Sequence, residues 1–156
     1  MKIQTEVLTE AVFEELLPLA RSCWHESTVY KGTSCAYDGE RDFPIEPDLA
    51  QYLRFQSHGW LVLVTLRNEQ LCGYGIGLLY ESMHHKGILG ALGDTFYVQP
   101  DYRSYSPVLA EALEKALAGK GAHIIGWPVH INGPVYQLLE ARGYTGDDVV
   151  MEKRLK

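Results

Sequence analysis

Two apolar segments joined by a short polar connection, near the middle of the chain, constrain its fold most. Trp60–Leu66 and Leu71–Tyr80 are rich in residues that favour strands, and Arg67-Asn68-Glu69-Gln70 between them is typical of a hairpin connection. We therefore expect two neighbouring antiparallel strands. One face of the second strand lacks side chains, so another backbone or a ligand can lie close to it. Glycine occupies alternate positions there: Gly73, Gly75 and Gly77.

The segments on either side of this hairpin predict one α/β domain with a mixed, mostly antiparallel sheet of about six strands and helices on both faces. The order is β-α-α-β-β-β-α-β-α-β, and the helix between strands four and five implies a parallel pair with a right-handed crossover. The expected elements are a strand at Lys2–Val7, a helix from Thr9 to about Trp24, a helix at Pro47–Ser57, a strand at Ile88–Val98, a helix from Ser106 to Gly119 with Ser106 as its N-cap and Pro107 as its first helical residue, a strand at His123–Val129, a helix from Asn132 to Gly143 and a strand at Asp148–Leu155.

Two local features modify this plan. Pro18 lies within the first helix and is expected to kink it or to end its first segment, because proline lacks the amide donor and crowds the preceding turn. Glu26–Glu46 is rich in Gly, Ser, Thr, Asp and Pro and is expected to form a long ordered loop, which in a compact domain is usually functional.

Composition excludes several classes of protein. The chain has 156 residues, 46% of them hydrophobic, which suits one domain spanning the whole chain. The net charge of −6 argues against a nucleic-acid partner. The longest apolar run, Trp60–Val64, is too short to cross a membrane, and the N-terminus resembles no signal peptide. The three cysteines fit neither a disulfide framework nor a metal site, so we expect a cytoplasmic protein without metal.

Three segments resemble the GNAT superfamily of acyl-CoA-dependent N-acetyltransferases, and Leu17-Pro18-Leu19-Ala20 and His25-Glu26-Ser27 are similar to small phage-encoded members. Val98-Gln99-Pro100-Asp101-Tyr102-Arg103 is similar to the family's "V-x-P-x-Y-R" strand exit, and Asn132–Tyr144 to its "N-x-x-A…G-F" helix. Leu71-Cys72-Gly73-Tyr74 is similar to its "vvG" strand. The resemblance covers nearly the whole chain and implies the GNAT fold, acetyl-CoA as cosubstrate, and a small-molecule or peptide amine as acceptor. A homodimer is common in the family.

The resemblance also implies where acetyl-CoA binds. Arg103, Ser104, Tyr105 and Ser106 match the loop that holds the pyrophosphate, although the family's glycines are absent from this sequence. Amide donors at a helix N-terminus and serine hydroxyls can still hold an anion there. In the family, a bulge aims an amide, here that of Phe96, at the acyl carbonyl, and pantetheine pairs with the backbone of Val98 and contacts Asn132. Asn132 is also expected to cap the last helix.

Other residues match the catalytic and acceptor positions. Asp94 lies where relatives place a general base, and a carboxylate facing the sheet interior would have a raised pKa; alternatively, Asp94 closes a turn after Gly93. Leu139 occupies the position of the usual tyrosine acid, so Tyr136, one turn earlier, serves only if the helix is shifted. Three consecutive residues match the region where the family builds its acceptor pocket: Trp24, His25 and Glu26. Alternatively, they form a helix terminus with a packed tryptophan.

Three functions remain open at this level, because a fold does not determine an activity. The first is transfer of acetyl from acetyl-CoA to a primary amine by direct attack in a ternary complex. The second is a GNAT-fold binding or structural module that has lost CoA binding, and the third is CoA binding without catalysis. Small amines, aminoglycosides, peptide N-termini and protein lysines are all open as acceptors.

Overall fold

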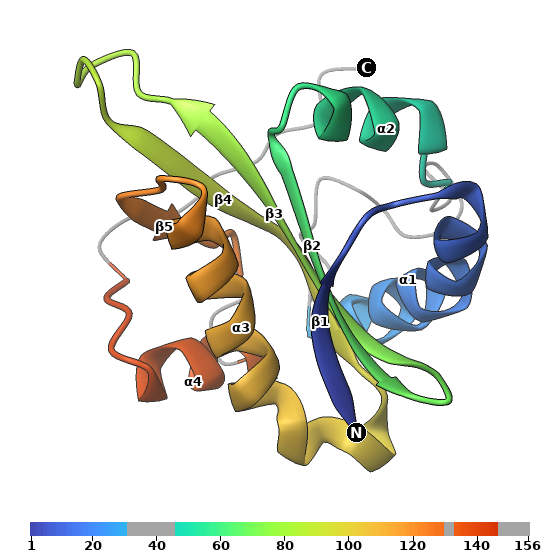
Figure 1. Cartoon of the computed structure of the whole chain (residues 1–156). Coiled ribbons are helices and arrows are strands. Elements are labelled where there is room, and N and C mark those ends of the chain that lie inside the picture. The colour runs from blue at the N-terminus through green and yellow to red at the C-terminus, as the bar shows by residue number, and fades with distance from the viewer. Residues whose placement is uncertain (31–45, 130–132, 147–156) are drawn as a thin grey trace, which may run out of the picture.

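The computed structural model of the protein describes residues 1–30, 46–129 and 133–146 (Figure 1). Most of the expected loop at Glu26–Glu46, the expected cap Asn132 and the expected last strand at Asp148–Leu155 lie outside the described residues. Within them, no helix has both the length and the apolar character that a membrane span requires.

Five strands form a single mixed sheet in the order β1-β2-β3-β4-β5. Its strands are β1 (Lys2–Glu6), β2 (Leu61–Asn68), β3 (Gln70–Glu81), β4 (Leu89–Val98) and β5 (Ile124–Gly126). Neighbouring strands are antiparallel except β4 and β5, which are parallel as expected for a crossover through a helix. The expected hairpin is confirmed as β2 and β3. Its turn is tighter than expected, because Asn68 pairs with Gln70 and Glu69 alone adopts a left-handed conformation with φ of 63°.

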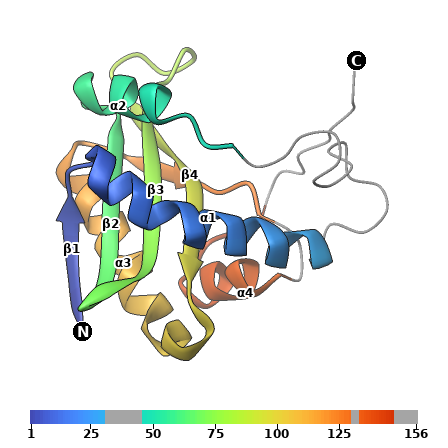
Figure 2. The ribbon, with the colours of Figure 1, turned by 90° about the vertical axis from the view of Figure 1, so that its right-hand side faces the viewer.

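Helices cover both faces of the sheet, as expected (Figures 1 and 2). On one face lie α1 (Glu10–Tyr30) and α2 (Leu49–Ser57), and on the other lie α3 (Ser106–Gly119) and α4 (Pro134–Ala141). Alternate residues of β2 enter the two cores: Leu61 and Leu63 pack with α1, whereas Val62 and Val64 pack with α3. Burial on both faces explains why this strand is a continuous apolar run.

The first helix is longer than expected and passes through Pro18. A proline inside a helix costs about 3 kcal/mol or more. Phe13 and Leu16 before it and Leu19 after it all pack into the same buried cluster, so burial of one continuous stripe offsets the lost hydrogen bond. The expectation that the loop begins at Glu26 was wrong, because Glu26 lies within α1.

Three expected helix starts also differ. Helix α2 begins at Leu49 rather than Pro47, because the Asp48 side chain caps it by accepting a hydrogen bond from the Gln51 amide. Ser106 is the first residue of α3, not its cap, since a 3₁₀ segment, η3 (Pro100–Tyr105), leads directly into that helix. Helix α4 begins at Pro134, and its N-cap position is occupied by Gly133, which has no side chain to cap the helix.

The glycine face of β3 accommodates a helix rather than a ligand. Cβ atoms placed at Gly75 and Gly77 would lie 3.0 Å from Leu113 and 2.8 Å from Leu117, two fully buried residues of α3. The missing side chains therefore allow α3 to pack closely against the sheet.

Gly77→Val is expected to lower the free energy of unfolding by about 1–3 kcal/mol, because the new side chain would displace Leu117 from a packed core. Gly126→Val is the matched control in a strand, since a Cβ there has no atom within 4 Å. Urea denaturation followed by circular dichroism measures both. Equal stability of the two variants would show that the Gly77–Leu117 contact is not tight.

Candidate active site

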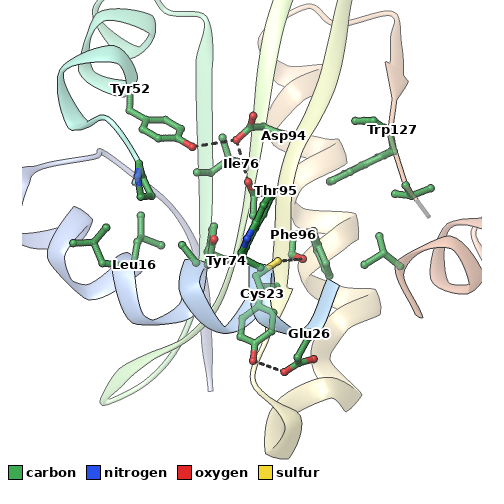
Figure 3. Close-up of a pocket in the computed structure, with 18 of the residues that line it drawn as sticks. Leu16, Cys23, Glu26, Tyr52, Tyr74, Ile76, Asp94, Thr95, Phe96 and Trp127 are labelled. Carbon is green, nitrogen blue, oxygen red and sulfur yellow. Dashed lines mark hydrogen bonds between the residues drawn. The ribbon is translucent and has the colours of Figure 1, made fainter. Parts of the chain in front are cut away.

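A pocket of about 500 Å³ opens on the α1 face of the sheet, beside the ends of β4 and β5 (Figure 3). The two strands pair only from Gly90–Leu92 to Ile124–Gly126, and beyond these pairs each contributes to a different wall of the pocket. Helix α4 adds a further wall. Carboxyl ends of parallel strands are where ligands of open α/β sheets bind. The residues that line the pocket include Phe13, Leu16, Leu17, Trp24, Glu26, Glu46, Tyr52, Tyr74, Ile76, Asp94, Thr95, Phe96, Tyr97, Trp127 and Tyr136.

Asp94 is the extra residue of a β-bulge. Gly93 pairs with Gly77 and Thr95 pairs with Ile76, so no residue of β3 opposes Asp94. A bulge bends its strand and redirects a side chain, and here the Asp94 carboxylate lies at the pocket (Figure 3). Asp94 therefore does not close a turn, since β4 continues through it. The expectation that its carboxylate faces the sheet interior was also wrong, because the residue is exposed.

Hydroxyl groups orient this carboxylate. The Tyr52 hydroxyl donates to Asp94 Oδ2 at 3.4 Å, and the Thr95 hydroxyl donates to the same oxygen at 3.1 Å. Within the described ranges, no lysine, arginine or histidine forms an ion pair with Asp94. The carboxylate is thus held in place while its charge stays available to a cationic ligand.

Tyr52 is a site residue that the sequence did not reveal. Burial, followed by the charge of Asp94 and the hydrogen bond to it, raises the pKa of Tyr52 to about 12. The phenol therefore stays protonated at neutral pH and donates to Asp94. In the sequence, Tyr52 is one of several residues at helical spacing within Pro47–Ser57, and this pattern predicts only that it belongs to the core.

Asp94→Asn is expected to lower the pKa of Tyr52 without restoring the ordinary value of 10.0, because burial, the larger cause, remains. The raised pKa makes a contribution to stability that is complete below pH 10.0 and is lost as pH rises through about 12. Absorbance titration measures the ionisation of the tyrosines in the wild-type protein and in Asp94→Asn, each with and without the Tyr52→Phe substitution. In each background, the difference between the two curves is the titration of Tyr52 alone. An unchanged Tyr52 titration would show that the two groups do not interact.

A second carboxylate, Glu26 of α1, lies toward the other end of the pocket from Asp94 (Figure 3). The Tyr97 hydroxyl donates to Glu26 Oε1 at 2.8 Å, and the Arg103 guanidinium forms an ion pair with the same carboxylate. Burial and this hydrogen bond raise the pKa of Tyr97. Arg103 also donates from Nε to the Val98 carbonyl at 3.4 Å. The ion pair thus joins Glu26, which was expected at the acceptor pocket, to Arg103, which was expected at the pyrophosphate.

The far wall carries Tyr136 and Trp127. Tyr136 of α4 lines the pocket, and a hydrogen bond to Glu140 and the charge of that carboxylate raise its pKa. Leu139, at the family's usual acid position, is buried core. The Trp127 indole lies against the backbone of Gly93, where a Cβ would be 2.1 Å from the ring, and meets Phe96 edge-on with centroids 6.1 Å apart.

The remaining expected residues divide into two groups. Trp24 and Phe96 line the pocket together with Asp94, Glu26 and Tyr136. Val98 is buried in the α3 core instead, and His25 is exposed and is not among the described lining residues. Residues 103–106 lie on η3 and the start of α3, outside that lining. No group of three or more metal-ligating side chains occurs in the part of the chain that the structure describes.

Comparisons with models of protein families and with curated proteins found no match. Solved structures do match. The tetramutant of the BH1408 protein from Bacillus halodurans superposes with a TM-score of 0.76 at 13% identity, covering 99% of this chain and 100% of that one. Glucosamine-6-phosphate N-acetyltransferase from Arabidopsis thaliana gives a TM-score of 0.68 at 14% identity, with 100% of both chains covered.

A further match is AAC(6')-Iy in complex with the bisubstrate analog CoA-S-monomethyl-acetylneamine. Its TM-score is 0.68 at 13% identity, over 100% of this chain and 99% of that one. The chain has the GNAT fold. Identities of 13–14% show the shared fold and its mixed sheet alone.

Proposed function

We propose that the protein is an N-acetyltransferase that moves acetyl from acetyl-CoA to a primary amine by direct attack in a ternary complex. The observation that carries the proposal is the bulge at Asp94, which puts a carboxylate without a described cationic partner into a pocket beside the diverging strands β4 and β5. The acetyltransferases among the matching structures and the CoA analog bound to AAC(6')-Iy support it.

In this proposal, Asp94 accepts the proton of the attacking amine. The new C–N bond forms as the C–S bond of the thioester breaks, and Tyr136 donates a proton to the departing thiolate. The Phe96 amide supports the charge that develops on the carbonyl oxygen. Tyr52 and Thr95 act as positioning residues, because they hold the carboxylate in one orientation.

The described residues fit the two ends of acetyl-CoA differently. The pocket suits the thioester end. At the phosphate end, Arg103 supplies a positive charge, but the Ser106 amide already donates to the Arg103 carbonyl and Pro107 has no amide. Helix α3 therefore offers fewer amide donors than an open helix N-terminus does. Binding rests on the Arg103 guanidinium and on the hydroxyls of Ser104 and Ser106, and the phosphates compete with Glu26 for Arg103.

The small number of amide donors at the phosphate end favours the alternative function, a GNAT-fold module that does not bind CoA. A thermal-shift titration with acetyl-CoA separates the two, because a ligand of the native state raises its stability by about 2.7 kcal/mol at a hundredfold excess over Kd. We expect Tm to rise by roughly 5–10 °C. No stabilisation at millimolar acetyl-CoA would overturn the enzyme proposal and favour the binding module.

Ser104→Asp combined with Ser106→Asp is expected to weaken acetyl-CoA binding at least tenfold, because two added negative charges would repel the pyrophosphate. The same titration measures the loss. Replacement of both serines by asparagine, which adds no charge, is the control. Equal affinities of the two double variants would place the pyrophosphate elsewhere.

A further inference from the structure

The charged side chains that line the described part of the pocket are all of one sign. Glu26, Glu46 and Asp94 are acidic, and no lysine, arginine or histidine occurs among the described lining residues. Glu26 is paired with Arg103, whereas Asp94 at the β4 bulge accepts hydrogen bonds from hydroxyl groups and pairs with no described cation. A pocket of this sign attracts an ammonium group and repels a phosphate.

The walls between the two carboxylates are apolar and aromatic. Leu16, Tyr74 and Ile76 are each no more than 5% exposed and line the pocket together with the two carboxylates (Figure 3). Phe13, Trp24 and Phe96 extend this lining. Such surfaces gain free energy by covering an apolar ligand, and aromatic faces also favour a nearby cation.

Three hydroxyl groups of the pocket already have partners. The hydroxyls of Tyr52 and Thr95 donate to Asp94, and that of Tyr97 donates to Glu26. The walls between these groups are apolar, and burying a sugar hydroxyl against them without a partner costs about 1–3 kcal/mol. The lining therefore disfavours a polyhydroxylated acceptor as well as a phosphorylated one.

We infer that the acceptor is a primary amine with a single positive charge and an apolar, aryl or alkyl body, without phosphate or sugar. This inference rests on the proposed function. Its ammonium group lies at Asp94, and its body lies along α1 between Leu17 and Ile76. The preferred acceptor thus differs from those in the names of two structural neighbours, glucosamine 6-phosphate and an aminoglycoside derivative, although the fold is shared.

Isothermal titration of the full chain, with and without acetyl-CoA, tests the inference independently of turnover. The probes are 2-phenylethylamine, its uncharged analogue 2-phenylethanol, glucosamine and glucosamine 6-phosphate. We expect 2-phenylethylamine to bind at least tenfold more tightly than each of the others. Equal or tighter binding of either sugar, or no binding of 2-phenylethylamine, would overturn the inference. Binding of 2-phenylethylamine without release of CoA thiol would overturn the proposed function instead.

Leu17→Lys supplies a second readout, because it adds a positive charge to the half-buried wall. It is expected to weaken 2-phenylethylamine binding at least tenfold and to strengthen glucosamine 6-phosphate binding. Leu53→Lys places the same charge on α2 outside the described lining and is expected to change neither. Circular dichroism verifies that both variants fold. The same response from both variants would show that the ligand does not lie along α1.

Discussion

Asp94→Asn is expected to lower kcat for acetyl transfer at least a hundredfold while the Kd for acetyl-CoA stays within about threefold. Loss of a general base typically costs a factor of 10² to 10⁴ in rate, whereas a packing effect in an exposed residue is severalfold. The substitution keeps the shape of the side chain, and an amide can still accept from Tyr52 and Thr95. Release of CoA thiol at saturating amine measures kcat, and calorimetry measures Kd.

The pH dependence of the same reaction gives an independent readout. With a carboxylate base, the rate of the wild-type protein rises with pH through one apparent pKa, and this rise shifts or disappears in Asp94→Asn. Glu81→Gln, an exposed residue at the end of β3 and outside the described lining, is the control. Full activity of Asp94→Asn would show that the base is another group, and Glu26 or His25 would be the next candidate.

Tyr136→Phe is expected to lower kcat by roughly a hundredfold, because the thiolate would lose its proton donor. The raised pKa of Tyr136 keeps the phenol protonated across the working pH range. Tyr80→Phe, on β3 and outside the described lining, controls for the loss of a hydroxyl. Both rates come from the thiol-release assay. If Tyr136→Phe keeps full activity, Tyr136 is a packing residue and the thiolate leaves unassisted or takes its proton from water.

The sheet was predictable because its signals are local. Residues 60–66 and 71–80 combine strand-forming side chains with a short polar connection, and the structure shows the expected antiparallel pair. The parallel pairing of β4 and β5 follows from the helix between them. The GNAT fold was therefore accessible from the order of elements and the motif that ends at Arg103.

The parts that the sequence did not show depend on contacts between distant residues. Tyr52 meets Asp94 across 42 positions, and Glu26 meets Arg103 across 77, and no local pattern marks either pair. The end of α1 was misplaced because the polar residues after Trp24 are typical of a loop, whereas the helix continues to Tyr30. A serine followed by a proline is typical of a helix N-cap, but the 3₁₀ segment that precedes Ser106 leads directly into α3, so Ser106 is already helical.

We propose above all that the pocket at the Asp94 bulge transfers acetyl to an amine. The most direct measurement is mass spectrometry of the products formed when the wild-type protein is incubated with acetyl-CoA and a panel of primary amines, beside Asp94→Asn. We expect an acetylated amine and one equivalent of free CoA with the wild-type protein, and at least a hundredfold less of both with the variant. Acetyl-CoA that binds without forming an acetylated amine, or equal product from both proteins, would contradict it.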